Sequence, residues 1–157
     1  MKRWAWILGA IGILLFFSGA GTQVEELKPV SLLCVRKEAG EVCLETDGGD
    51  LGRGKDFSSA VGDLGLSSAG TVFLDTTEYV VLEEQGAECL KDLYEVLRPA
   101  AEVCLGVGNL SPETAAAYLK AHSPEVTLGE LRTGEGKLPL LTVREGRYYI
   151  VGTETDR

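Results

Sequence analysis

An alternation of apolar and polar positions predicts a β-hairpin over residues 32–45. A turn at residues 37–40 would place Cys34 opposite Cys43 and Arg36 opposite Glu41, all four on one face of the two strands. The apolar residues of the opposite face are Leu33, Val35, Val42 and Leu44. We therefore expect a hairpin with one core face and a second face that carries a cross-strand disulfide.

Two further segments show the spacing of helices. Leu90, Leu93, Tyr94 and Leu97 recur at helical intervals. Pro99 ends this pattern, because the residue before a proline avoids the helical region. A second helix is predicted from Ser111, which supplies an N-cap before Pro112 and Glu113, to about His122.

Five other apolar segments indicate strands. Residues 71–74 and 79–82 flank a polar turn and predict either a second hairpin or one long bent strand, and residues 101–107 predict a strand after Pro99. Residues 138–144 and 147–151 flank Glu145 and Gly146, which predicts a hairpin with Val143 opposite Tyr148 and one ring of Tyr148 and Tyr149 on each face. Together these elements predict an α/β (α+β) fold in which two helices pack on a mainly antiparallel or mixed sheet.

The N-terminal segment has the layout of a signal peptide. Lys2 and Arg3 precede an uncharged apolar run from Trp4 to Phe17, and small residues lie at the positions that a signal peptidase reads before Gly21. We expect cleavage after Ala20 and an extracytoplasmic location, secreted, periplasmic or at the cell surface. The alternative is an uncleaved membrane anchor over residues 4–21, since glycines do not stop a helix in lipid.

Composition limits the partners. Asp and Glu outnumber Lys and Arg by 24 to 15, and the net charge of −9 disfavours nucleic acid and anionic lipid. Asn109 is the only asparagine, and there are two glutamines and one methionine, which indicates a thermostable protein from a heat-adapted source or a biased genome composition.

The four cysteines form an even set, which in an exported protein predicts disulfides. Three pairings are possible. The hairpin favours Cys34 with Cys43, and the second pair is then Cys89 with Cys104, which lie roughly 14 and 15 Å along a helix and a strand from the corner at Pro99. Redox catalysis and zinc binding are the alternatives, but both usually use closer pairs such as Cys-x-x-Cys.

Residues for other chemistry are scarce. His122, the only histidine, lies at a predicted helix end, where imidazoles usually contact terminal carbonyls or solvent. Asp47, Asp50 and Asp56 could supply oxygens to Ca²⁺, but their spacing does not follow the helix-loop-helix pattern. We predict no catalytic residues, no cofactor and no metal.

From Thr71 to Gly152 the expected order is strand, helix, strand, helix and then a hairpin entered by Leu138-Pro139-Leu140. This order resembles the thioredoxin-like fold, in which a cis proline precedes the hairpin, and Pro139 would hold that place. The family's Cys-x-x-Cys is missing after residues 71–74, and the chain ends before a final helix. The resemblance implies the architecture and does not imply the redox chemistry.

These patterns divide the chain into successive parts. They are a signal peptide or anchor over residues 1–20, a tether over 21–29, a disulfide-bonded hairpin over 30–46, a Gly-rich connection over 47–70 and an α/β core domain over 71–157. The function that they favour is that of an exported, disulfide-stabilised domain that binds an unknown protein or small molecule. The alternative is a degenerate thioredoxin-like thiol-disulfide protein.

Overall fold

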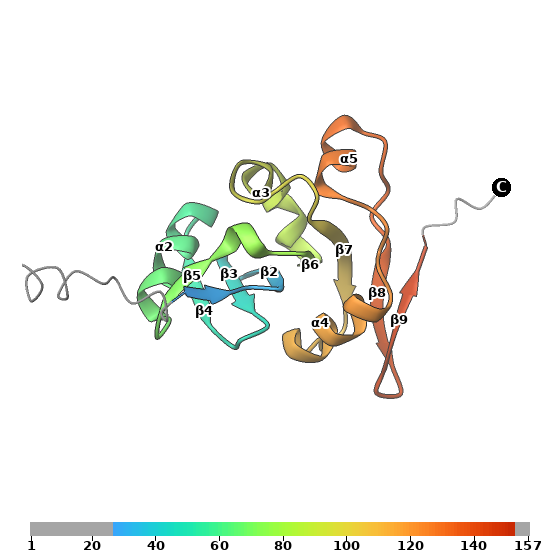
Figure 1. Ribbon diagram of the computed structural model, residues 1–157, viewed down its shortest axis with the longest axis horizontal. Helices are drawn as coiled ribbons and strands as arrows, with labels where there is room; N and C mark the ends of the chain where they lie inside the picture. Colours follow the sequence, from blue (N-terminus) through green and yellow to red (C-terminus); the bar gives the residue numbers. More distant parts are fainter. Residues whose placement is uncertain (1–26, 153–157) are drawn as a thin grey trace, which may run out of the picture.

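The computed structural model describes residues 27–152 and shows a seven-stranded mixed sheet with helices on both faces (Figure 1). Across the sheet the strands are β4 (Leu51–Gly54), β3 (Glu41–Thr46), β2 (Leu32–Glu38), β6 (Tyr79–Glu83), β7 (Glu102–Val107), β8 (Leu140–Arg144) and β9 (Arg147–Val151). The neighbouring strands from β2 through β6 and β7 to β8 are parallel, and the three outer pairings are antiparallel. The mixed sheet confirms the predicted α/β class.

The helices are divided unequally between the two faces of this sheet. Helices α2 (Phe57–Ser67), α3 (Leu90–Val96) and α5 (Leu128–Thr133) pack on one face, where their buried residues join those of the strands. Helix α4 (Pro112–Ala121) packs on the other face through Ala115 and Leu119. Helices α3 and α4 confirm the two predicted helices, while α2 and α5 make the helical layer larger than expected.

The hairpin of β8 and β9 has the predicted register. Val143 lies opposite Tyr148, and Leu141 lies opposite Ile150. Glu145 and Gly146 form the turn with φ angles of 51° and 73°. A two-residue turn with both φ angles positive fits the twist of paired strands, so the sequence at this turn determines the register.

The hairpin of β2 and β3 forms, but its predicted register is wrong by two residues. Ala39 and Gly40 make a tight turn, with φ angles of 52° and 87°, in place of the expected four-residue turn. Cys34 therefore lies opposite Glu45, and Cys43 lies opposite Arg36. The Arg36 guanidinium pairs with Glu45 at 2.9 Å across the two strands.

Residues 71–82 form neither a hairpin nor one bent strand. Strand β5 (Thr71–Phe73) pairs in parallel with β1 (Leu27–Pro29) in a separate two-stranded sheet, so part of the predicted tether is a strand. A 3₁₀ turn over Leu74–Thr76 then redirects the chain into β6. The Thr76 hydroxyl accepts a hydrogen bond from the Val30 amide at 3.0 Å, which fastens this turn to the end of β1.

The predicted Gly-rich connection is instead a strand and a helix. Strand β4 continues the sheet, and α2 packs directly on it. A Cβ atom added at Gly52 would lie 2.5 Å from Leu64 Cβ, and one at Gly54 would lie 2.6 Å from Ser59 Cβ. The two glycines thus allow the helix to approach the strand backbone.

The order of elements from β6 to β9 agrees with the order that suggested a thioredoxin-like fold, apart from the additional helix α5, while β5 belongs to a separate sheet. No cis peptide bond occurs within residues 27–152, so the expected cis bond before Pro139 is wrong. The thioredoxin-like resemblance itself stays a prediction.

The predicted signal peptide or anchor lies outside the described residues. Between residues 27 and 152, no helix combines the length and apolar character needed to cross a membrane.

Candidate functional site

The structure does not support either predicted disulfide, because all four cysteines are buried free thiols. Cys34 and Cys104 lie on the α4 face, on strands that are separated by β6 and therefore roughly 10 Å apart, which is beyond disulfide range. Cys89 belongs to the core of the opposite face, so the sheet separates it from Cys104. The predicted pairing of Cys34 with Cys43 fails because the observed register of the first hairpin places Cys34 opposite Glu45 and Cys43 opposite Arg36.

Burial suppresses the nucleophilicity of three of these thiols, those of Cys34, Cys89 and Cys104. It raises the pKa of Cys104 to about 12. The pKa of Cys34 is raised by burial first and then by the nearby carboxylates of Glu83 and Glu45, and burial also raises the pKa of Cys89. Since the thiolate is the reactive form, these residues act as small core side chains. Nothing among them favours the redox alternative.

His122 has the structural role that sequence analysis expected. Its backbone amide donates to the carbonyl of Tyr118 at the end of α4, and its ring stacks on the Tyr118 ring at a centroid distance of 4.4 Å. Tyr148 lies close by on the same face and donates its hydroxyl to the Ser111 carbonyl. This cluster fastens α4 to the sheet.

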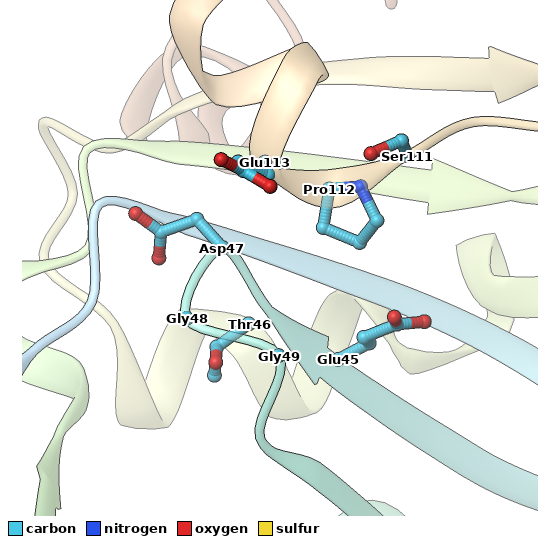
Figure 2. A pocket seen from close by; sticks show the side chains of 8 residues that line it. All are labelled: Glu45, Thr46, Asp47, Gly48, Gly49, Ser111, Pro112 and Glu113. Atoms are coloured by element: carbon cyan, nitrogen blue, oxygen red, sulfur yellow. The ribbon is translucent and has the colours of Figure 1, made fainter.

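A polar cavity of about 440 Å³ lies between the β3–β4 turn and the start of α4 (Figure 2). Its acidic residues are Glu45, Asp47 and Glu113. The Asp47 carboxylate accepts the amides of Ser31 and Leu32, and Glu45 is paired with Arg36, so two of the three acids already hold the local structure. Within residues 27–152 no group of three or more acidic, histidine or cysteine side chains could hold a metal ion.

The remaining candidates for a calcium site also have structural partners. Asp50 forms an ion pair with Lys28 at 3.1 Å. Asp56 caps α2 by accepting the Ser59 amide at 2.7 Å, and hydrogen bonding with Ser59 lowers the pKa of its carboxyl group. The aspartates of residues 47–56 therefore stabilise turns and a helix end.

Among residues 27–152, no helix covers the face of β7, β8 and β9 opposite α4 toward the C-terminal ends of β7 and β8, below α5 (Figure 1). The register aligns Val107, Thr142 and Tyr149 in one row across the three strands. Val107 is 48% exposed and Tyr149 is 43% exposed, whereas Val103 on the same face of β7 is fully buried. We call Val107, Leu140, Thr142, Tyr149 and Val151 the open face.

Two arginines border the open face. Arg144 and Arg147 are direct cross-strand partners at the turn end of the hairpin, on the same face as Thr142 and Tyr149. Among the residues that the structure describes, neither arginine takes part in an ion pair. Arg144 also lines a cavity of about 410 Å³ with Tyr149 and Val151. Like charges directly opposite each other destabilise a hairpin, so this arrangement has a cost in the isolated protein.

Strand β9 is also an edge of the sheet. In a hairpin with a two-residue turn, the residues next to the turn form a hydrogen-bonded pair, and such pairs alternate along the strands. Arg147, Tyr149 and Val151 therefore bond to β8, while the backbone groups of Tyr148 and Ile150 point outward. The outward amides, the open face and the arginines lie together on one exposed hairpin.

Sequence analysis placed one tyrosine on each face of this hairpin but did not single out the arginines. The predicted register already set Arg144 opposite Arg147, so this like-charge pair could have been recognised from the sequence as part of a candidate site. The exposure of the face was not predictable, because it depends on where α3 and α5 pack.

Comparison with known proteins gives no match: no family model, no curated protein and no solved structure is significantly similar to the chain.

Proposed function

We propose that this chain is an exported binding domain that holds an extended segment of a partner protein against β9. The observation that carries the proposal is the open face beside the outer edge of β9, which pairs with no other strand of the described residues, with Val107, Tyr149 and Val151 each more than two-fifths exposed. Export is supported by the signal-peptide layout of residues 1–20.

The physical basis of binding is strand addition. A partner strand would hydrogen-bond to the outward backbone groups of Tyr148 and Ile150, and its side chains would cover the open face from the side of β9. Exposed edges are usually short, charged or covered, because free backbone groups promote association. Strand β9 combines a free edge with the apolar residues Tyr149, Ile150 and Val151, which is the composition of an interaction surface.

Site-specific photo-crosslinking tests this proposal. A benzophenone amino acid at position 149 should crosslink a partner in extracytoplasmic extracts of the producing organism. The control carries the same group at Leu66, which is 88% exposed on α2, the helix that packs on β4 at the opposite edge of the sheet. Equal crosslinking at both positions, or none at position 149, would contradict the proposal.

A backbone variant distinguishes strand addition from non-specific hydrophobic association. Ile150→Pro removes the outward amide, while Ile150→Ala removes nearly the same side chain and keeps the amide. We expect crosslinking from position 149 to be lost with proline and retained with alanine. If both variants behave alike, the partner does not add as a strand.

A further inference from the structure

We infer that the partner segment is acidic, and that Arg144 and Arg147 select it by binding its carboxylates. This inference rests on the proposed function and specifies the chemistry of the ligand at the same surface. The occupant is an extended peptide with carboxylate side chains at alternate positions, paired with β9.

The charges around the open face favour an acidic ligand. The chain carries a net charge of −9, yet the open face is bordered by two arginines that the described residues leave without ion pairs. Glu145 lies in the turn between them and lines the cavity with Arg144, but forms an ion pair with neither. A guanidinium binds a carboxylate through two parallel hydrogen bonds, so the two arginines offer places for acidic side chains.

The geometry of an added strand also favours an acidic ligand. Arg144, Arg147 and Tyr149 share one face of the hairpin, and side chains of an added strand alternate between the two faces. Every second residue of the ligand would therefore lie on the arginine side. The ligand that fits has its carboxylates at alternate positions toward the turn end of the hairpin, near Arg147 and beyond it, followed on the same face by apolar residues near Tyr149 and Val151. Such a segment would also relieve the repulsion between the two arginines.

Selection from a displayed library of random short peptides tests the inference without a known partner. The native chain should enrich peptides with acidic residues at alternate positions, and these should bind about tenfold more tightly than the same peptides with lysine in place of the acids. The double variant Arg144→Glu, Arg147→Glu should enrich basic peptides instead. The double variant Arg144→Lys, Arg147→Lys should keep the acidic preference with weaker binding.

The outcomes distinguish a failure of the acidic specificity from a failure of strand addition. Peptides that bind the native chain without charge preference, and lose binding with Ile150→Pro but not Ile150→Ala, would overturn the acidic specificity and leave strand addition in place. No enrichment by the native chain would overturn both. Acidic peptides that bind equally well to Ile150→Pro would support charge recognition and contradict strand addition.

The chain's own acidic residues after β9 are the main competing occupant. Glu154 and Asp156 follow the strand closely in sequence. If library peptides bind only when Glu154→Gln and Asp156→Asn are introduced, the arginines serve the chain's own C-terminus and the inference is wrong. Displacement of the peptides by a single-stranded oligonucleotide, with loss of its binding in the Glu variant, would likewise assign the arginines to another ligand.

Discussion

The close packing of α2 on β4 allows a sharp test of the structure. In Gly52→Ala the new methyl group would lie 2.5 Å from Leu64 Cβ and 2.7 Å from the Leu64 amide nitrogen. Real Cβ contacts are essentially never below 3.0 Å, so α2 must move away from the strand. The move would disturb Phe57, Ala60 and Leu64, which are the buried residues of the helix.

Overpacking of this kind costs roughly 1 to 3 kcal/mol, and the backbone contact places Gly52→Ala near the upper end. For a domain of this size, 3 kcal/mol corresponds to a fall in Tm of about 10 °C. Urea unfolding followed by far-UV circular dichroism measures the loss directly.

Gly62→Ala is the matched control in the same helix. An added Cβ there meets no atom within 4 Å, so the change should stabilise the protein by about 0.5 to 1 kcal/mol through helix propensity alone. An unchanged unfolding midpoint for Gly52→Ala, or an equal loss for Gly62→Ala, would refute the described packing of α2.

Three further outcomes follow from single residues. Stability should fall as the pH rises above about 9, and Cys104 should contribute up to roughly 1.4 kcal/mol per pH unit of this loss, because it ionises in the unfolded chain while its folded pKa is about 12; Cys104→Ala should reduce the slope by about that amount in urea titrations, leaving the part due to the other buried thiols. Arg147→Glu should raise the free energy of unfolding by roughly 0.5 kcal/mol in low salt and less in high salt, since it places opposite charges across the hairpin; a loss would contradict the repulsion. Thr127→Ala should cost about 1 kcal/mol by calorimetry because Thr127 and Glu130 form a capping box, whereas Thr127→Ser should cost less.

The elements that the sequence predicts correctly are those that neighbouring residues specify. The β8–β9 register follows from Glu145 and Gly146 alone. The β2–β3 register was wrong because Ala39, which is not a glycine, adopts a positive φ and shortens the turn. Helix α5 was missed although Thr127 and Glu130 have the spacing of a capping box, which was a readable signal.

Local sequence patterns could not predict the elements that depend on distant partners. Strand β5 pairs with β1, a segment too short and polar to predict a strand, so residues 71–82 were assigned to one unit. Cys89 and Cys104 were paired by their similar distances from the corner at Pro99, but the alternation along β7 directs Cys104 to the face away from Cys89. At the candidate site, the side chains of the hairpin were predictable and their exposure was not.

The central position of β2 in the sheet also has a consequence for the folding pathway. Its partner β3 follows after a two-residue turn, but its other partner β6 pairs Tyr79 with Leu32, roughly 47 positions earlier, which adds about 2 kcal/mol of loop-closure entropy relative to a hairpin. Until that contact forms, one apolar edge of β2 stays open to pairing with other chains. During synthesis, the chain must therefore extend beyond Glu83 before its N-terminal strands are protected from aggregation.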